Sequence, residues 1–148
     1  DEAFGVSPQT RPAPTDAAQF SGLRVLLAED NDVNQLIARA VLRSLGCEVQ
    51  AAGNGGEALA AFESGRWDLV LMDCQMPVMD GYVATAGIRA LEAREPQRGR
   101  VPVVALTAHA MAGERDRCLA AGMDDYLSKP YRKEQLLDVI RRWCRVAA

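Results

Sequence analysis

Residues 68–81 read Asp-Leu-Val-Leu-Met-Asp-Cys-Gln-Met-Pro-Val-Met-Asp-Gly. The apolar run at the start of this stretch is continuous rather than alternating, which is typical of a strand buried on both faces of a parallel sheet. The run stops at Asp73, and Pro77 and Gly81 follow shortly afterwards. The stretch therefore predicts a central strand over residues 68–72, then a loop, then a helix that starts after Gly81.

Similar units lie on both sides of this stretch. Short apolar runs predict strands at residues 23–28, 47–51, 101–106 and 125–127, and helical patterns lie at about residues 33–45, 55–63, 112–121 and 133–146. Asn31 or Asp32 and Asn54 are suited to cap helix starts, and Gly46, Gly65 and Gly122 to end helices. This alternation predicts an α/β fold, a doubly wound (βα)5 unit whose parallel sheet has the strand order 2-1-3-4-5.

Two segments outside the strands complete this outline. The helix near residues 33–45 is predicted from an apolar series at helical spacing: Val33, Leu36, Ile37, Ala40, Val41 and Leu45. Residues 1–20 contain Pro8, Pro12 and Pro14 among small polar residues and have no apolar period. They are predicted to be a linker or a disordered N-terminal segment, which leaves residues 21–148 for one folded domain.

Composition excludes several classes of function. The chain has 148 residues, 49% hydrophobic and 25% charged, which fits one ordinary globular domain. A formal net charge of −3 provides no attraction to phosphate backbones, so direct contact with nucleic acid is not expected. No apolar run reaches about 18 residues and no signal peptide opens the chain. We expect a cytoplasmic domain without membrane contact, with anchoring of a parent protein in the inner membrane left open.

The cysteines do not form a recognisable metal motif. Cys47, Cys74, Cys118 and Cys144 lack C-x-x-C spacing, and His109 is the single histidine of the chain. A zinc site is therefore not expected, and the thiols are predicted to be reduced. His109 stands two residues after Thr107 and is expected to lie at the rim of the site or to face solvent.

Polar residues follow four of the predicted strands. They are Glu29-Asp30, Asp73, Thr107 and Lys129-Pro130. In a doubly wound sheet ligands bind at the carboxyl ends of the strands, where the strand order reverses, here between the first and third strands. Carboxylates about 5 Å apart at an effective dielectric constant near 20 repel by roughly 3 kcal/mol per pair. Oxygen-only ligands favour a hard cation, so Mg²⁺ is expected there, with Mn²⁺ as an alternative.

A metal-bound carboxylate cluster of this kind supports covalent phosphoryl chemistry. Asp73 lies at the end of the central strand and is the best placed nucleophile for forming an aspartyl phosphate. The transferred group carries charge on three equatorial oxygens. Lys129, the Thr107 hydroxyl and the metal held by Asp30 and Asp73 can each neutralise or bond one of these oxygens.

Together these residues resemble a known family. Glu29-Asp30, residues 71–81, Ala105-Leu106-Thr107-Ala108 and residues 125–130 resemble, in this order, the receiver domain of response regulators. The resemblance covers residues 23–146 and implies the flavodoxin-like receiver fold. It implies a role for each site residue: Asp73 as phosphoacceptor, Asp30 as direct metal ligand, Glu29 as a ligand through water, Gln75 as a ligand through its backbone carbonyl, Thr107 and Lys129 as the phosphoryl-binding pair, Thr107 and Tyr126 as the switch, and Lys129-Pro130 as a cis peptide bond.

The resemblance also implies a function and partners. The domain would accept a phosphoryl group from phosphohistidine, catalyse its own phosphorylation and dephosphorylation, and belong to a hybrid histidine kinase. Its partners would be a histidine kinase dimerisation domain, a histidine phosphotransfer domain, or both. Docking is expected around Asn34 and Ala38 and at the loop after Lys129. A stand-alone single-domain response regulator and a pseudo-receiver that only binds protein remain alternatives.

Two other classes fit the residues less well. Haloacid-dehalogenase-like phosphatases place a general acid two residues after the nucleophilic aspartate, where this chain has Gln75. A flavodoxin-like FMN binder needs a phosphate loop after the first strand, and residues 28–32 are acidic instead. An acidic loop would repel the FMN phosphate.

Overall fold

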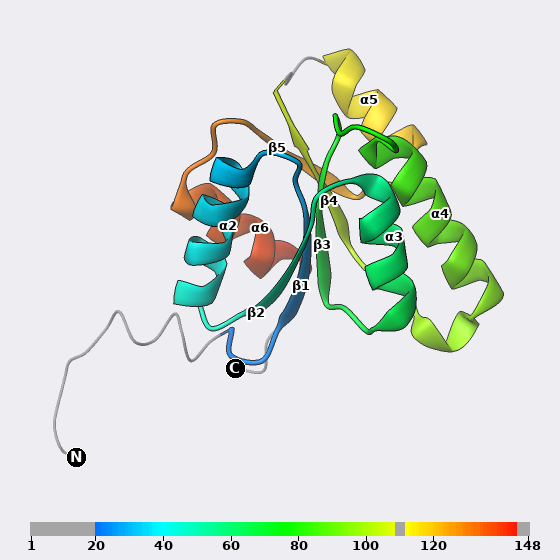
Figure 1. Cartoon of the computed structure of the whole chain (residues 1–148), viewed down its shortest axis with the longest axis horizontal. Coiled ribbons are helices and arrows are strands. Elements are labelled where there is room, and N and C mark those ends of the chain that lie inside the picture. Colours follow the sequence, from blue (N-terminus) through cyan, green and yellow to red (C-terminus); the bar gives the residue numbers. More distant parts are fainter. Residues whose placement is uncertain (1–19, 109–111, 145–148) are drawn as a thin grey trace, which may run out of the picture.

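The fold is a parallel sheet covered by helices on both faces (Figure 1). The computed structural model describes residues 20–108 and 112–144. Within them the strand order is β2-β1-β3-β4-β5, as predicted. The strands are β1 (Arg24–Ala28), β2 (Glu48–Ala52), β3 (Leu69–Asp73), β4 (Val103–Thr107) and β5 (Asp125–Ser128).

Helices follow each strand. They are α2 (Asp32–Ser44), α3 (Gly55–Ser64), α4 (Gly81–Arg94), the short 3-10 helix η1 (Pro96–Arg98), α5 (Ala112–Ala120) and α6 (Lys133–Trp143). Helices α2 and α6 cover one face of the sheet, and α3, α4 and α5 cover the other (Figure 1). Within the described residues, none of the helices has the length and apolar character needed to span a bilayer.

The central strands explain why their sequences are apolar throughout. Every residue of β3 and β4 is buried. On β3, Leu69 and Leu71 pack into the core on the α2 and α6 side, while Val70 and Met72 pack into the core on the other side. Successive side chains of a strand point to opposite faces, so a strand between two helical layers needs apolar residues at every position.

The helix caps predicted at Asn31 and Asn54 are confirmed, and Asp80 adds a third. Asn31, Asn54 and Asp80 stand before α2, α3 and α4, and each side chain accepts a hydrogen bond from a backbone N–H of the first helical turn. Such a bond satisfies one of the N–H groups that a helix start leaves without an intrahelical partner.

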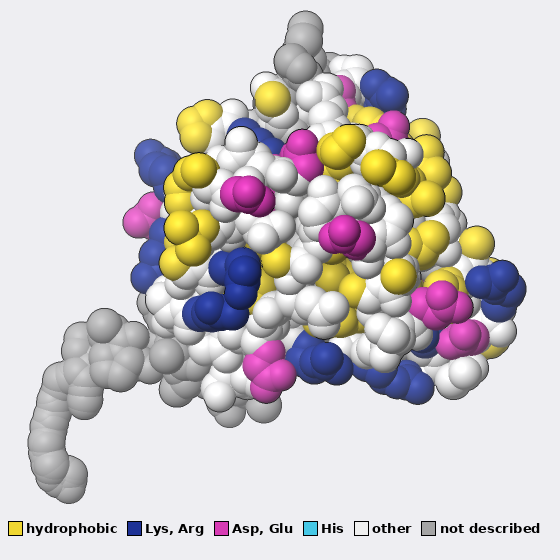
Figure 2. All heavy atoms as spheres, in the orientation of Figure 1, with side chains coloured by type: hydrophobic (Ala, Val, Ile, Leu, Met, Phe, Trp, Pro, Cys, Tyr) yellow, Lys and Arg dark blue, Asp and Glu magenta, His cyan; other side chains and the backbone are white. Residues whose placement is uncertain are grey.

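The apolar series of α2 divides between two faces of the helix. Its buried residues are Ala38 and Leu42, followed by Leu45 just after the helix. Val33, Leu36 and Ile37 are 64%, 68% and 57% exposed. The predicted series therefore marks mainly a solvent-facing side of α2, where Figure 2 shows apolar side chains gathered. The helix is apolar on nearly opposite sides, and periodicity alone does not say which side meets the sheet.

Some predicted boundaries were wrong. Phe20, assigned to the linker, is fully buried against the α2 and α6 side of the sheet, so the packed region includes it. Strand β4 begins at Val103 rather than Val101. Pro102 has no N–H to contribute to a ladder, which explains a start after it. Helix α6 ends at Trp143, because the backbone of Cys144 is already extended, and residues 145 and 146 of the predicted helix lie outside the described residues.

Candidate functional site

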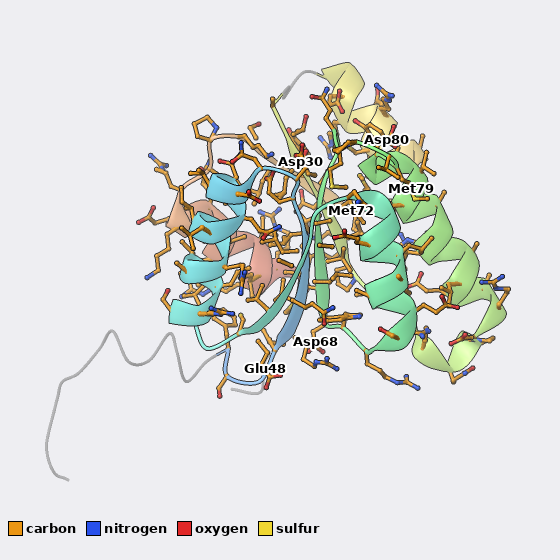
Figure 3. All side chains as sticks on the ribbon, in the orientation of Figure 1. Asp30, Glu48, Asp68, Met72, Met79 and Asp80 are labelled. Atoms are coloured by element: carbon orange, nitrogen blue, oxygen red, sulfur yellow. The ribbon has the colours of Figure 1, made fainter. Side chains whose placement is uncertain are left out.

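The carboxyl ends of the strands meet at one rim of the sheet, where Asp30 and Asp80 lie in Figure 3. The register of β1 against β3 pairs Ala28 with Met72, so Glu29 and Asp73 come next to each other directly beyond that pair. On the other side, Asp73 pairs with Leu106 of β4. This rim is where strand order reverses, and it is the expected place for a ligand site.

Lys129 joins the two buried acids of the site. Its Nζ donates to Glu29 Oε1 and to Asp73 Oδ2, each at 2.8 Å. Glu29 and Asp73 are almost fully buried, whereas the Lys129 side chain keeps 21% exposure. The residues come from β1, β3 and the end of β5, so the fold assembles this cluster from positions separated by up to 100 residues.

The acids of the cluster fit a hard divalent cation. One carboxylate oxygen each from Glu29, Asp30 and Asp73 lies within 4.8 Å of the others. Three carboxylates and one ammonium leave an excess of two negative charges, which matches Mg²⁺. All donors in the set are oxygens, the ligand type that Mg²⁺ prefers. The geometry thus suits the predicted ion, while the ligand role of each residue stays a prediction.

Hydrogen bonds hold Glu29 in place from the start of α2. Asn31 N–H donates to Glu29 Oε2 at 3.2 Å, and the Gln35 side-chain amide donates to the Glu29 backbone carbonyl at 3.0 Å. Sequence reasoning used Asn31 only as a cap and missed Gln35. No motif indicates Gln35, because its contact depends on how α2 is placed beside β1.

Burial and neighbouring charges shift the pKa values of this cluster. Burial raises the pKa of Glu29, the Lys129 hydrogen bond opposes this rise, and Asp73 adds to it. For Lys129, burial acts to lower the pKa, but the hydrogen bonds and charges of Asp73 and Glu29 outweigh burial. The pKa of Lys129 is therefore raised, and its ammonium group is charged at neutral pH.

The loop after β3 is shaped by close backbone contacts. Gln75 N–H donates to Asp73 Oδ1 at 3.0 Å, which orients the carboxylate. Gly81 N–H donates to the Cys74 carbonyl at 3.2 Å, and a Cβ at Gly81 would collide with the Asp73 carbonyl. Val78 has φ 68°, the left-handed region that a β-branched residue rarely adopts. The loop is therefore both tightly packed and strained.

Thr107 and the residues after it lie at the same rim. Thr107 is buried at the end of β4, where its register partner is Ser128, and its carbonyl accepts a hydrogen bond from Lys129 N–H at 2.7 Å. The Lys129-Pro130 bond is cis, as predicted. Tyr126 lies further back on β5, half-buried against the core. His109 lies outside the described residues.

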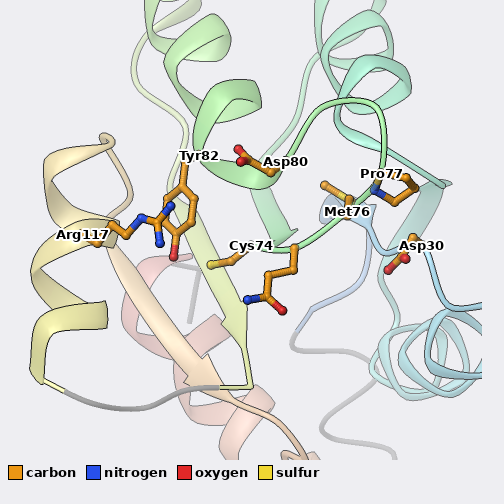
Figure 4. Close-up of a pocket in the computed structure, with 8 residues that line it drawn as sticks. Asp30, Cys74, Met76, Pro77, Asp80, Tyr82 and Arg117 are labelled. Carbon is orange, nitrogen blue, oxygen red and sulfur yellow. The ribbon is translucent and has the colours of Figure 1, made fainter.

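Two hollows adjoin the acid cluster on opposite sides. One has a volume of about 390 Å³ and its lining includes Asp30, Gln75, Tyr82 and Arg117 (Figure 4). The other, of about 270 Å³, is lined by six residues: Glu29, Asn34, Ile37, Lys129, Pro130 and Tyr131. The second hollow connects the buried acids with the exposed apolar side of α2.

Comparison with known proteins assigns the family. The sequence matches the response regulator receiver domain over residues 25–141. The chain belongs to this family. The receiver fold and the predicted strand order are confirmed by the sheet described above.

Relatives of this receiver domain include much longer kinases. It is 48% identical over 124 residues to the sensor protein GacS of Pseudomonas syringae pv. syringae, covering 84% of this chain and 14% of GacS. It is 46% identical over 123 residues to hybrid signal transduction histidine kinase G of Dictyostelium discoideum, covering 82% of this chain and 4% of that kinase. The chain thus spans only a small part of the curated relatives it matches.

Solved receiver domains have the same fold. One is the receiver domain of a sensor histidine kinase from Pseudomonas aeruginosa, which was crystallised with a magnesium ion coordinated in its active-site cleft. The two domains are 48% identical with a TM-score of 0.75, and the match covers 83% of this chain and 98% of that one. Another is the receiver domain of Ssk1 in complex with the histidine phosphotransfer protein Ypd1 of Saccharomyces cerevisiae, with a TM-score of 0.78, 34% identity, and coverage of 83% and 89%.

The structure also sorts the cysteines of the receiver domain into two neighbourhoods. All four are buried and free. Burial raises the pKa of Cys47 to about 11 and that of Cys144 to about 12, so these thiols are neutral at pH 7. Cys74 and Cys118 lie on the other face of the sheet, beside Glu114. The expectation that the chain has no zinc site was based on the spacing of the cysteines along the chain, which does not reveal this grouping in space.

Proposed function

We propose that Asp73 of this receiver domain accepts a phosphoryl group from a phosphohistidine in a phosphorelay. One observation carries the proposal. The buried Asp73 carboxylate bonds the Lys129 ammonium at 2.8 Å inside a cluster of acids with an uncompensated negative charge. A merely structural ion pair has no need of two further acids at the same point.

The proposed transfer uses the carboxylate as nucleophile. An Asp73 oxygen forms a bond to phosphorus while the phosphorus–nitrogen bond of the phosphohistidine breaks, and the imidazole leaves with the electron pair. Lys129 then shifts its hydrogen bond from Asp73 Oδ2 to a phosphoryl oxygen and keeps Glu29 as its second partner. The Thr107 hydroxyl bonds another phosphoryl oxygen.

The predicted ligand set would hold a magnesium ion beside this reaction. Asp30 and Asp73 would bind it directly, Glu29 through water, and Gln75 through its backbone carbonyl. When bound, the ion supplies positive charge for the third phosphoryl oxygen. The magnesium ion in the cleft of the Pseudomonas aeruginosa relative supports this assignment. Mn²⁺, which prefers the same oxygen ligands, is the alternative ion.

Phosphorylation would be read out through Thr107 and Tyr126. The hydroxyl of Thr107 moves toward the phosphoryl group, which frees space for the Tyr126 ring to rotate. The face built from α5, β5 and α6 then changes shape, so a local charge event biases a two-state element. A single Tyr126 rotamer with and without beryllofluoride, a phosphoryl analogue, would contradict this part of the proposal.

We place the domain in a hybrid histidine kinase, where it passes its phosphoryl group to a histidine phosphotransfer domain. The names of the relatives and the solved pair of Ypd1 and Ssk1 support this context. The docking surface we propose is the exposed side of α2, with Val33, Leu36 and Ile37, plus the hollow beside Lys129 and Pro130. Ala38 is excluded from it, because only 1% of this residue is exposed.

The acceptor is tested with acetyl phosphate and magnesium on a gel that retards phosphoproteins. We expect wild-type protein to shift, Asp73→Asn to show no shift, and Asp80→Asn to shift like wild type. Asp80 is the matched control because it caps α4 from the same loop. Labelling that persists in Asp73→Asn would refute the proposed acceptor.

The docking surface is tested by phosphotransfer to a histidine phosphotransfer domain. Ile37→Glu places a charge within the apolar side of α2, and we expect transfer at least about tenfold slower, since interface centres tolerate charges poorly. Val83→Glu on α4 is the control, because Val83 is similarly exposed at 54%. Equal rates for both variants would place docking elsewhere.

A further inference from the structure

A second cluster of metal-ligating side chains lies outside the acidic site. The Cys74 and Cys118 sulfurs and a Glu114 carboxylate oxygen all lie within 4.8 Å of one another. Cys74 directly follows β3, whereas Glu114 and Cys118 lie four residues apart on α5. Residues at i and i+4 share one side of a helix, so α5 presents both to the end of β3.

We propose that Cys74, Cys118 and Glu114 form a site for a thiophilic divalent ion of the zinc type. Zinc binds sulfur at about 2.3 Å and carboxylate oxygen at about 2.0–2.2 Å in a tetrahedron, which places ligand atoms roughly 3.4–3.8 Å apart. The three groups therefore need to close by about 1.4 Å at most. With three protein ligands, the fourth position is open to water.

A neighbouring arginine can compensate the net charge of such a complex. Two thiolates and one carboxylate around a divalent ion leave one negative charge, and binding releases the two thiol protons to solvent. The Arg117 guanidinium lies next to Cys118 in the chain and 4.3 Å from the centre of the Tyr82 ring. It supplies one compensating positive charge.

An unsatisfied hydroxyl points to the same place. The Tyr82 hydroxyl is buried and has no hydrogen-bond partner among the described residues. Tyr82, Arg117 and Cys74 line one hollow of about 390 Å³, into which the Tyr82 hydroxyl and the Cys74 thiol point in Figure 4. A thiolate or a metal-bound water would give the hydroxyl its missing partner, and the hollow provides a path for the ion.

This site differs in chemistry from the acidic one and does not depend on the proposed phosphotransfer. The acidic cluster offers oxygens only and suits a hard ion, whereas two thiolates select a soft one. The ion would connect the loop that starts directly after Asp73 to α5. Zinc would therefore hold α5 against the end of β3, whether or not Asp73 accepts a phosphoryl group.

The site is tested by titrating reduced full-length chain with Co²⁺, a spectroscopic substitute for zinc. We expect one ion per chain to produce thiolate-to-cobalt charge-transfer absorption and the intense visible bands of tetrahedral cobalt. Zinc should displace cobalt and remove both. Absence of charge-transfer absorption at saturating Co²⁺ would overturn the proposal, because an ion in the acidic cluster has no sulfur ligand.

Variants assign the signal to its residues. Cys118→Ser leaves Cys74 as the one proposed thiolate ligand, so at saturating Co²⁺ the charge-transfer band should fall to about half. Binding should weaken more than about 100-fold, because even partners beyond the direct ligands cost 10–100-fold. Glu114→Gln, at a half-buried helix position that tolerates the change, should keep the band with weaker affinity, and Tyr82→Phe should weaken binding about tenfold. Circular dichroism checks that each variant is folded.

Two control variants separate the sites. Cys144→Ser alters a buried cysteine on the opposite face of the sheet and should keep the band, as should Asp30→Asn, which alters the acidic cluster. A band of undiminished intensity in Cys118→Ser, or one that disappears in Cys144→Ser, would assign the thiolate ligands elsewhere and overturn the proposal.

Discussion

At the amino-terminal rim of the sheet, Arg89 bonds Glu92 and Asp124 at 2.8 Å each, and Arg100 bonds Asp124 at 2.7 Å. Two arginines meet two acids. Glu92 Oε2 also accepts a hydrogen bond from Val101 N–H, and Asp124 Oδ2, which bonds Arg89, accepts another from Val103 N–H. At the carboxyl-terminal rim, Lys129 pairs with Glu29 and Asp73, and Asp30 adds a third carboxylate to the same cluster. The first cluster is electrically balanced, whereas the second carries an excess of negative charge that a divalent cation can neutralise.

The two rims also differ in which residues adopt the left-handed backbone conformation. Among the described residues, those with positive φ before β1, β2, β4 and β5 are all glycines: Gly22, Gly46, Gly99 and Gly122. In the loop after β3 the left-handed position is occupied by Val78. Glycine adopts this region at little cost, whereas a β-branched side chain is strained there. The backbone is therefore unstrained at these positions of the amino-terminal rim, whereas the loop at the carboxyl-terminal rim is strained at Val78.

The largest contrast is expected in catalysis. Lys129→Met keeps an apolar stem but removes the charge that faces the phosphoryl group, so phosphorylation by acetyl phosphate should slow by at least about 100-fold. Arg89→Met removes a charge from the opposite rim and should leave the rate unchanged. Stopped-flow or gel kinetics measure both, and a similar loss in the two variants would refute the division of roles.

With magnesium present, Arg89→Met should destabilise the protein more than Lys129→Met does, which reverses their order in catalysis. Arg89→Met leaves Glu92 and Asp124 with fewer partners, and the free energy of unfolding should fall by about 3 kcal/mol. Magnesium should not recover this loss, whereas it should offset much of the loss in Lys129→Met. Urea unfolding with and without the ion measures each value, and recovery of Arg89→Met by magnesium would contradict the comparison.

Magnesium should stabilise the folded protein only through the acids of the carboxyl-terminal rim. At a concentration of 100 times its Kd, the ion should add about 2.7 kcal/mol to the free energy of unfolding of wild type. Asp30→Asn should lose most of this gain, yet it should be more stable than wild type without the ion by about 1 kcal/mol, because a like charge is removed. Asp124→Asn should respond to magnesium as wild type does. Thermal unfolding in magnesium or EDTA decides between these outcomes.

The smallest expected effect concerns the backbone. Val78→Gly should stabilise the protein by about 1 kcal/mol, because it relieves the left-handed strain at a position that is 90% exposed. Gly99→Ala is the converse control, since an added Cβ meets nothing within 4 Å and tests φ alone. We expect it to destabilise by about 1 kcal/mol. Urea unfolding in which both changes destabilise would show that Val78 is not strained.

Sequence alone predicted the elements whose burial is complete. Strands β1, β3 and β4 have apolar runs because both faces are covered. The polar residues that follow the strands were predicted to share one rim: Glu29, Asp30, Asp73, Thr107 and Lys129. The side of α2 that meets the sheet could not be predicted, because the helix is apolar on two sides. Gln35 and the grouping of Cys74 with Cys118 depend on helix placement, which local patterns do not encode.

The Gln35 hydrogen bond to the Glu29 carbonyl ties the first turns of α2 to the acidic site. A partner bound at the proposed docking surface of α2 would therefore also act on one of the acids of the proposed metal site. Thermodynamic reciprocity then applies in both directions: if docking tightens magnesium binding by some factor, magnesium must tighten docking by the same factor. Through that single amide, occupancy of the proposed metal site would become a condition that a docking domain can sense.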